Sequence, residues 1–148
     1  MKKQAYTMIA MIVLVGSLTM AAQAQTNGRI ALIANIPFQF SIGNKSLPAG
    51  EYTVRSTIDD SRNVMLLIQS LDGKTSAMLQ TSTVEGKAQE RAKLVFHRYA
   101  NQYFFAQAWV DGEKTGLEAS KSRAERAAEH ELTANKMVTA SVVVTARR

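Results

Sequence analysis

Apolar residues occur in short stretches along most of this chain, and polar turn residues separate the stretches. From Ile36 to Ile42 every second residue is apolar, and the stretch Glu51–Ser56 alternates in the same way. A period of two residues is typical of β-strands with one buried face. Dipeptides such as Asp72-Gly73, which lies between two stretches, favour the tight turns of β-hairpins. The pattern therefore predicts antiparallel sheet.

The middle of the chain carries the strongest strand signals. Val64–Ile68 is apolar at every position, which predicts a central strand covered on both faces. Thr75–Val84 alternates again, and the charged stretch Glu85–Ala92 is expected to be a loop. Lys93–Tyr99 and Gln102–Val110 then read as a hairpin that holds most of the aromatic residues.

The pattern changes period near residue 122. Ser122 and Glu125 match a capping box, in which each side chain bonds to the free backbone N–H of the other residue. We expect a helix near residues 122–132 that docks weakly, because its apolar face holds small residues with a single leucine. The residues of this face are Ala124, Ala127, Ala128 and Leu132.

The chain returns to alternation in its last predicted element. Residues 136–146 are expected to form a terminal strand without internal charge. Such a strand either closes the sheet or offers an open edge to another chain. The whole pattern predicts an all-β fold, an antiparallel β-sandwich or small barrel of about 6–8 strands with one short C-terminal helix. The sequence leaves sandwich and barrel open.

The first 24 residues differ from the rest. Lys2 and Lys3 precede an apolar run, and Ala22-Gln23-Ala24 has the small residues of a signal-peptidase site. We therefore expect residues 1–24 to be a signal peptide and residues 25–148 to be a single exported domain, periplasmic or extracellular. No later segment is apolar enough for a membrane span after cleavage.

The amino-acid composition excludes several kinds of functional site. The chain has no Cys, which excludes disulfides, thiol catalysis and Cys-based zinc sites. The predicted leader holds Lys2 and Lys3 and no acidic residue, so cleavage lowers the net charge from +6 to +4. The positive residues are spread along the chain, which suits solubility or attraction to an anionic envelope polymer better than nucleic-acid binding.

Few residues suggest a catalytic, metal-binding or ligand-binding role. His97 lies mid-strand and His130 lies on the predicted helix, and neither has the spacing of a metal site or the partners of a catalytic base. We predict no catalytic residue, no metal and no cofactor. Tyr103, Phe105 and Trp109 are expected on one strand face, where they form either core or a ligand platform.

Several motifs together resemble a known family. Ile36–Gly43, Leu47–Val54, Lys93–Tyr99 and Ser120–Glu125 are similar to elements of a family of small, uncharacterised exported bacterial proteins. The resemblance covers roughly residues 35–126. It implies an exported β-domain and assigns no catalytic or binding residue.

These observations favour a non-enzymatic exported domain with a binding or structural role in the cell envelope. One alternative is a carrier of a small ligand, a glycan or a lipid, with a cavity lined by Tyr103, Phe105 and Trp109. Another is an assembly subunit that uses its terminal strand, and a third is an enzyme that relies on His97. A partner protein would bind through a sheet edge.

Overall fold

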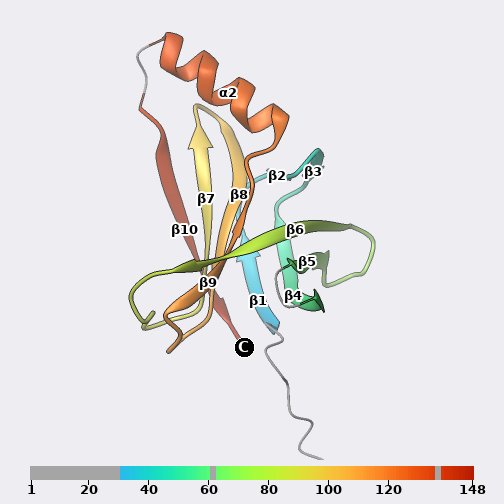
Figure 1. Cartoon of the computed structure of the whole chain (residues 1–148). Helices are drawn as coiled ribbons and strands as arrows, with labels where there is room; N and C mark the ends of the chain where they lie inside the picture. Colours follow the sequence, from blue (N-terminus) through green and yellow to red (C-terminus); the bar gives the residue numbers. More distant parts are fainter. Residues whose placement is uncertain (1–30, 61–62, 136–137) are drawn as a thin grey trace, which may run out of the picture.

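The alternating stretches of the chain form antiparallel strands that close into a barrel (Figure 1). The structure, a computed structural model, describes residues 31–60, 63–135 and 138–148, with the backbone alone for 58–60 and 63. Its elements in chain order are β1 (Ala31–Ile36), β2 (Phe40–Ile42), β3 (Lys45–Leu47), β4 (Gly50–Asp60), β5 (Asn63–Ser70), β6 (Ser76–Glu85), β7 (Lys93–Tyr99), β8 (Gln102–Trp109), β9 (Thr115–Ala119), α2 (Arg123–Ala134) and β10 (Ala140–Arg147).

Eight of these strands make the barrel wall in the order β8-β7-β10-β1-β4-β5-β6-β9, and β9 pairs again with β8. Each neighbouring pair is antiparallel. The sequence prediction of an antiparallel all-β fold with one C-terminal helix is thus confirmed, and the barrel is the form adopted. Closure leaves few free sheet edges, which is the advantage of a barrel over an open sheet.

β2 and β3 lie outside this order and complete one part of the wall. β9 reaches only Gln107–Trp109 of β8 and Thr81–Glu85 of β6. Beyond β9, β2 pairs in parallel with β8 at Phe104, and β3 pairs with β2. The Nζ atom of Lys45 donates a hydrogen bond to the carbonyl oxygen of Ser76, at the start of β6, over 2.6 Å. The β2–β3 hairpin therefore spans the distance between β8 and β6 that β9 leaves.

The predicted alternation from Ile36 to Ile42 is divided between two strands. β1 ends at Ile36 and β2 begins at Phe40, because Pro37 cannot donate a ladder hydrogen bond and bends the chain. Ile36, Phe40 and Ile42 are buried in the core, and Phe38 packs against it. The pattern gave the correct buried face, although β3 and β9 are strands that it did not reveal.

The barrel interior is filled with side chains. Phe96 lies at its centre and packs edge to face against Phe40 and Phe105, at centroid distances of 5.4 Å and 5.8 Å. Aliphatic side chains from the other strands complete the cluster; they include Leu32, Val54, Leu66, Ile68 and Leu94. An eight-stranded barrel has an interior of the size that side chains fill.

α2 packs outside the barrel, across the ends of β7 and β8 (Figure 1). Its buried residues are Glu125, Ala128 and Leu132, whereas Ala124 and Ala127 are exposed. The prediction of the apolar face was therefore wrong at Ala124 and Ala127. The buried face begins with Glu125 instead. Two apolar side chains, Ala128 and Leu132, pack with Tyr99 and Phe104 in a second small core.

The predicted signal peptide, residues 1–24, lies outside the described residues. In the described part of the chain no helix has both the length and the apolarity that crossing a bilayer requires.

Candidate functional site

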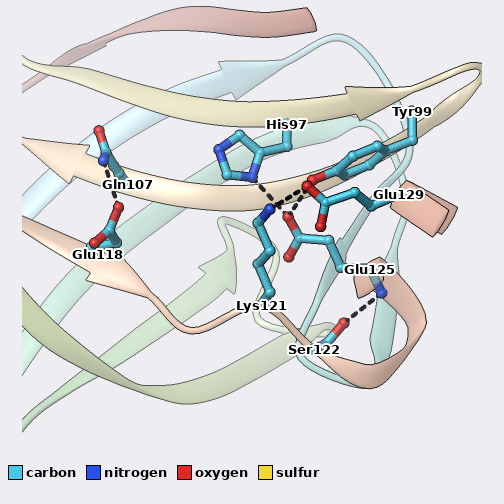
Figure 2. Close-up of polar contacts among 8 residues, drawn as sticks. All are labelled: His97, Tyr99, Gln107, Glu118, Lys121, Ser122, Glu125 and Glu129. Carbon is cyan, nitrogen blue, oxygen red and sulfur yellow. Dashed lines mark hydrogen bonds and ion pairs between the residues drawn. The ribbon is translucent and has the colours of Figure 1, made fainter. Parts of the chain in front are cut away.

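The outer face of β7 and β8 carries a group of polar side chains beneath α2 (Figure 2). On β7, Leu94 and Phe96 point into the core, so the alternate residue His97 points outward. Ser122 begins α2 in an extended conformation, and its Oγ accepts a hydrogen bond from the backbone N–H of Glu125. This cap fixes the first turn of the helix and places the Glu125 side chain over β7.

Glu125 is the centre of this group and is 3% exposed. Its Oε1 atom lies 2.7 Å from Nδ1 of His97 and accepts a hydrogen bond from the hydroxyl of Tyr99 over 3.2 Å. The contact engages Nδ1 of the His97 ring and leaves Nε2 outside it. The Ser122 half of the predicted capping box is confirmed, and the Glu125 carboxylate bonds to β7.

A second ion pair borders the group. The Nζ atom of Lys121 donates to Oε1 of Glu129 over 2.6 Å. This hydrogen bond raises the pKa of the Lys121 ammonium. Burial raises the pKa of the Tyr99 phenol above its usual 10.0, and the charge of Glu125 adds to the rise. Burial and the charge of Glu125 both favour the neutral Tyr99 phenol, which donates a hydrogen bond to Glu125.

The contacts of Glu125 with His97 and Tyr99 are suited to holding α2 against β7. A carboxylate that orients a histidine is one part of a general-base site, but such a site also needs a nucleophile or a bound water next to the free ring nitrogen. The hydroxyl groups of Ser122 and Tyr99 are engaged in the helix cap and at Glu125. In residues 31–60, 63–135 and 138–148, no group of three or more His, Asp or Glu side chains could hold a metal ion.

Trp109 lies on the outer wall, away from the other two predicted platform residues. β8 carries an irregularity opposite Val95 and Phe96, and the extra residue reverses the side-chain faces beyond it. The Trp109 ring packs over Gly116 of β9 and over Gly86, and its Nε1 donates to Gln107 over 2.9 Å. Gln107 in turn donates to Glu118 over 2.9 Å (Figure 2).

Tyr103 and Phe105 lie on the inner side of β8. Phe105 is buried in the core, and Tyr103 is half-buried, with its ring stacked on Phe38 at a centroid distance of 4.0 Å. The guanidinium of Arg98 lies 5.6 Å from the centre of the Tyr103 ring. The three residues expected on one strand face are therefore divided between the interior and the outer wall.

β10 has an edge that no described strand covers over its first half. Ala140–Thr145 pair with β7, but β1 pairs only with Ala146 and Arg147. β1 continues through Asn35 and Ile36, which extend this register beside Thr145 and Val144, and the chain then turns away toward β2 (Figure 1). Within residues 31–60, 63–135 and 138–148, the first four residues of β10, Ala140–Val143, thus have a strand on one side alone.

The backbone groups on this edge can be assigned from the ladder. The N–H of Ala146 bonds to the carbonyl oxygen of Ala92 over 2.8 Å, on the β7 side. Alternate residues of an antiparallel strand bond to the same neighbour, so Val142 and Val144 also bond to β7. Ser141 and Val143 therefore direct their N–H and C=O groups to the edge that lacks a strand.

The side chains along this edge are uncharged. Val143 points outward and is 57% exposed, and Val138, just before the strand, is 89% exposed. Ser141 and Thr145 flank Val143 on the same face and are exposed. Proteins usually protect such an edge with Lys, Pro or a bulge. None of these interrupts Ala140–Ala146, so among the described residues nothing protects this edge.

Comparison of this chain with protein-family models, with curated proteins and with solved structures found no match. Function is therefore argued from the chain's own residues.

Sequence reasoning did not find the contact of Glu125 with β7, nor which part of the terminal strand is uncovered. Glu125 already had a local explanation in the capping box, and 28 residues separate it from His97. The terminal strand was considered as a possible edge, but which of its residues stay uncovered depends on where β1 ends.

Proposed function

We propose that this protein is an exported, non-enzymatic binding domain of the cell envelope that pairs with an extended segment of another polypeptide along β10. The observation that carries the proposal is the uncovered edge of Ala140–Val143, with outward backbone groups at Ser141 and Val143. An extended peptide that adds a strand there gains main-chain hydrogen bonds, and side chains on alternate positions give selectivity.

The chemistry of the edge indicates the kind of segment. Ala140–Ala146 contains no charged residue, so nothing there selects for a charged peptide. The exposed Val143 gains burial against an apolar or β-branched neighbour, and Ser141 pairs well with a hydroxyl side chain. The expected segment is an uncharged strand that alternates small hydroxyl and β-branched residues.

The other functions have less support from the geometry. The aromatic side chains that a ligand carrier would use are divided between a filled core and the outer wall. The histidine that an enzyme would use lies against Glu125, in a contact that holds α2. Neither arrangement presents several polar groups to one open cavity. The β10 edge, in contrast, presents the backbone N–H and C=O groups of Ser141 and Val143 for pairing with another strand.

A labelled peptide tests strand pairing. The probe is a fluorescent, end-capped octapeptide of alternating Val and Thr, and its anisotropy is measured against the mature protein. Val143→Pro removes an N–H that points to the open edge and leaves the β7 ladder unchanged, so we expect its affinity for the probe to fall by about tenfold or more. Val143→Thr keeps the N–H and should bind like the wild type.

Circular dichroism of both variants shows that the barrel is folded. Equal affinity of folded Val143→Pro and wild type, or no anisotropy change with the wild type, would overturn the proposed function.

A further inference from the structure

The uncovered stretch of β10 is closed at one end. β1 continues beside Thr145 and Val144, so a partner strand cannot extend past Val143 in that direction. In the other direction, before the start of the strand, Val138 is 89% exposed. The backbone groups that point to this edge are the N–H and C=O groups of Ser141 and Val143. A strand that pairs here must fit a short edge with a fixed limit on one side.

The limit at Val143 selects the direction of the partner strand. In an antiparallel ladder one partner residue exchanges two hydrogen bonds with Val143, and the residue two further along exchanges two with Ser141. In a parallel ladder the carbonyl oxygen of Val143 would need the N–H of a partner residue opposite Val144. Ile36 of β1 occupies that position. Only an antiparallel partner therefore bonds to all four groups, and it runs in the same direction as β1.

This direction brings the N-terminal side of the partner against the end of β1. The residue opposite Val143 is the first that can pair, because the residue before it would collide with Ile36. An internal segment must bend sharply just before it pairs, and fixing that bend costs conformational entropy. A chain that begins at this residue needs no bend, and its α-ammonium group donates a charge-assisted hydrogen bond to the carbonyl oxygen of Val143.

We infer, on the basis of the strand-pairing role proposed above, that β10 receives the free N-terminal end of another polypeptide. The first residue of that chain lies opposite Val143, and a β-branched side chain there buries the exposed valine. The second residue lies opposite Val142, which is half-buried and packs against the core, so an apolar side chain fits. The third lies opposite Ser141 and suits a hydroxyl side chain.

Freeing one end of a peptide at a time tests which end is recognised. The probe is an alternating octapeptide that begins Thr-Val-Thr, with a fluorophore on a side chain near its C-terminal end and caps at both ends. Removing only the N-terminal acetyl group should lower its Kd for the mature protein by about tenfold. Removing only the C-terminal amide is the matched control and should leave the Kd unchanged. The protein is positively charged, so simple charge attraction would favour the free carboxylate instead.

Single cysteines test the direction, because the chain has none of its own. Directly opposite residues of a hydrogen-bonded antiparallel pair have Cα atoms about 5.5 Å apart, within the range of a disulfide. Val143→Cys should therefore couple to a peptide with Cys as its first residue at least about tenfold faster than to one with Cys as its last. Met78→Cys is the control, since Met78 is 60% exposed, close to the 57% of Val143, and should show no such preference.

The outcomes separate this inference from the proposed function. Equal Kd values for the N-terminally free and capped peptides, or faster coupling of the last residue to Val143→Cys, overturn the inference. If the capped peptide still binds the wild type more tightly than folded Val143→Pro, strand pairing stands and an internal segment is the partner. If no form of the peptide binds, both proposals are overturned. Circular dichroism confirms that each variant is folded.

Discussion

At the scale of single residues, Glu125 combines two roles that sequence patterns treat separately. Its position three residues after Ser122 favours the helix start, and its side chain bonds to His97 and Tyr99 of β7. A buried carboxylate is tolerated because two donors satisfy it. These contacts add to the small apolar contribution of Ala128 and Leu132, so the polar group is a main part of what holds α2 against the barrel.

Replacing Glu125 by Ala should lower the free energy of unfolding by about 1–3 kcal/mol, because the buried Tyr99 hydroxyl then loses its acceptor and His97, whose side chain is 28% exposed, loses its carboxylate partner. Glu129→Ala is the control, since Glu129 and Lys121 form a partly exposed pair whose loss should cost about 0–1 kcal/mol. Urea unfolding followed by circular dichroism measures both. Equal losses in the two variants would show that the buried contact has no special weight.

At the scale of elements, the irregularity in β8 decides which side chains face the core. Phe105 and Ala108 point inward although they are three residues apart, and Trp109 therefore lies outside, over β9. A period of two cannot describe a strand with an extra residue. The glycines at positions 86 and 116 provide the flat surface on which the indole rests; a Cβ at Gly116 would lie 2.6 Å from Cδ2 of Trp109.

Gly116→Ala should consequently destabilise the protein by about 1–3 kcal/mol, because the added methyl forces the indole out of its place. Gly50→Ala is the matched control on another strand, where the nearest atom, Cε2 of Tyr52, lies 3.6 Å from the added carbon. Its effect should stay below about 1 kcal/mol. The penalty of Gly116→Ala should shrink in a Trp109→Leu background, and a penalty that does not change there would refute the contact.

At the scale of the whole molecule, closure of the barrel joins the first and last described strands through a short contact. β1 pairs with β10 at two positions only, Ile33 with Arg147 and Ala34 with Ala146. On its other side all of β1 pairs with β4, and the chain then crosses to β8. The barrel is therefore continuous, while one half of β10 is left with an uncovered edge. The strand pairing proposed for this edge follows from that geometry.

Stability of the whole fold should fall in alkali. Burial raises the pKa of the phenols of Tyr52 and Tyr99 above 10.0, so the folded state keeps protons that the unfolded chain releases near that pH. Their contribution is present below about pH 10 and is lost as the pH rises through the folded pKa values. Lys121, whose pKa is also raised, acts in the same direction.

Urea midpoints measured from about pH 9 to about pH 11 should therefore decrease, and Tyr99→Phe should decrease less steeply. Tyr99→Phe also loses the hydrogen bond to Glu125, so the slope with pH is the informative quantity. An unchanged slope in this variant would mean that Tyr99 does not contribute to the alkaline loss.

The sequence by itself determined the period of the strands, most of their turns, the helix start at Ser122 and the all-β class, because these depend on neighbours within a few residues. It placed Ile36, Phe40 and Ile42 on one buried face for the same reason. Only the tertiary structure decided between barrel and sandwich, the contact of Glu125 with His97, the outward turn of Trp109 and the uncovered half of β10. Each of these depends on register between segments far apart in the chain, and hydrophobic alternation is the same whichever strands become neighbours.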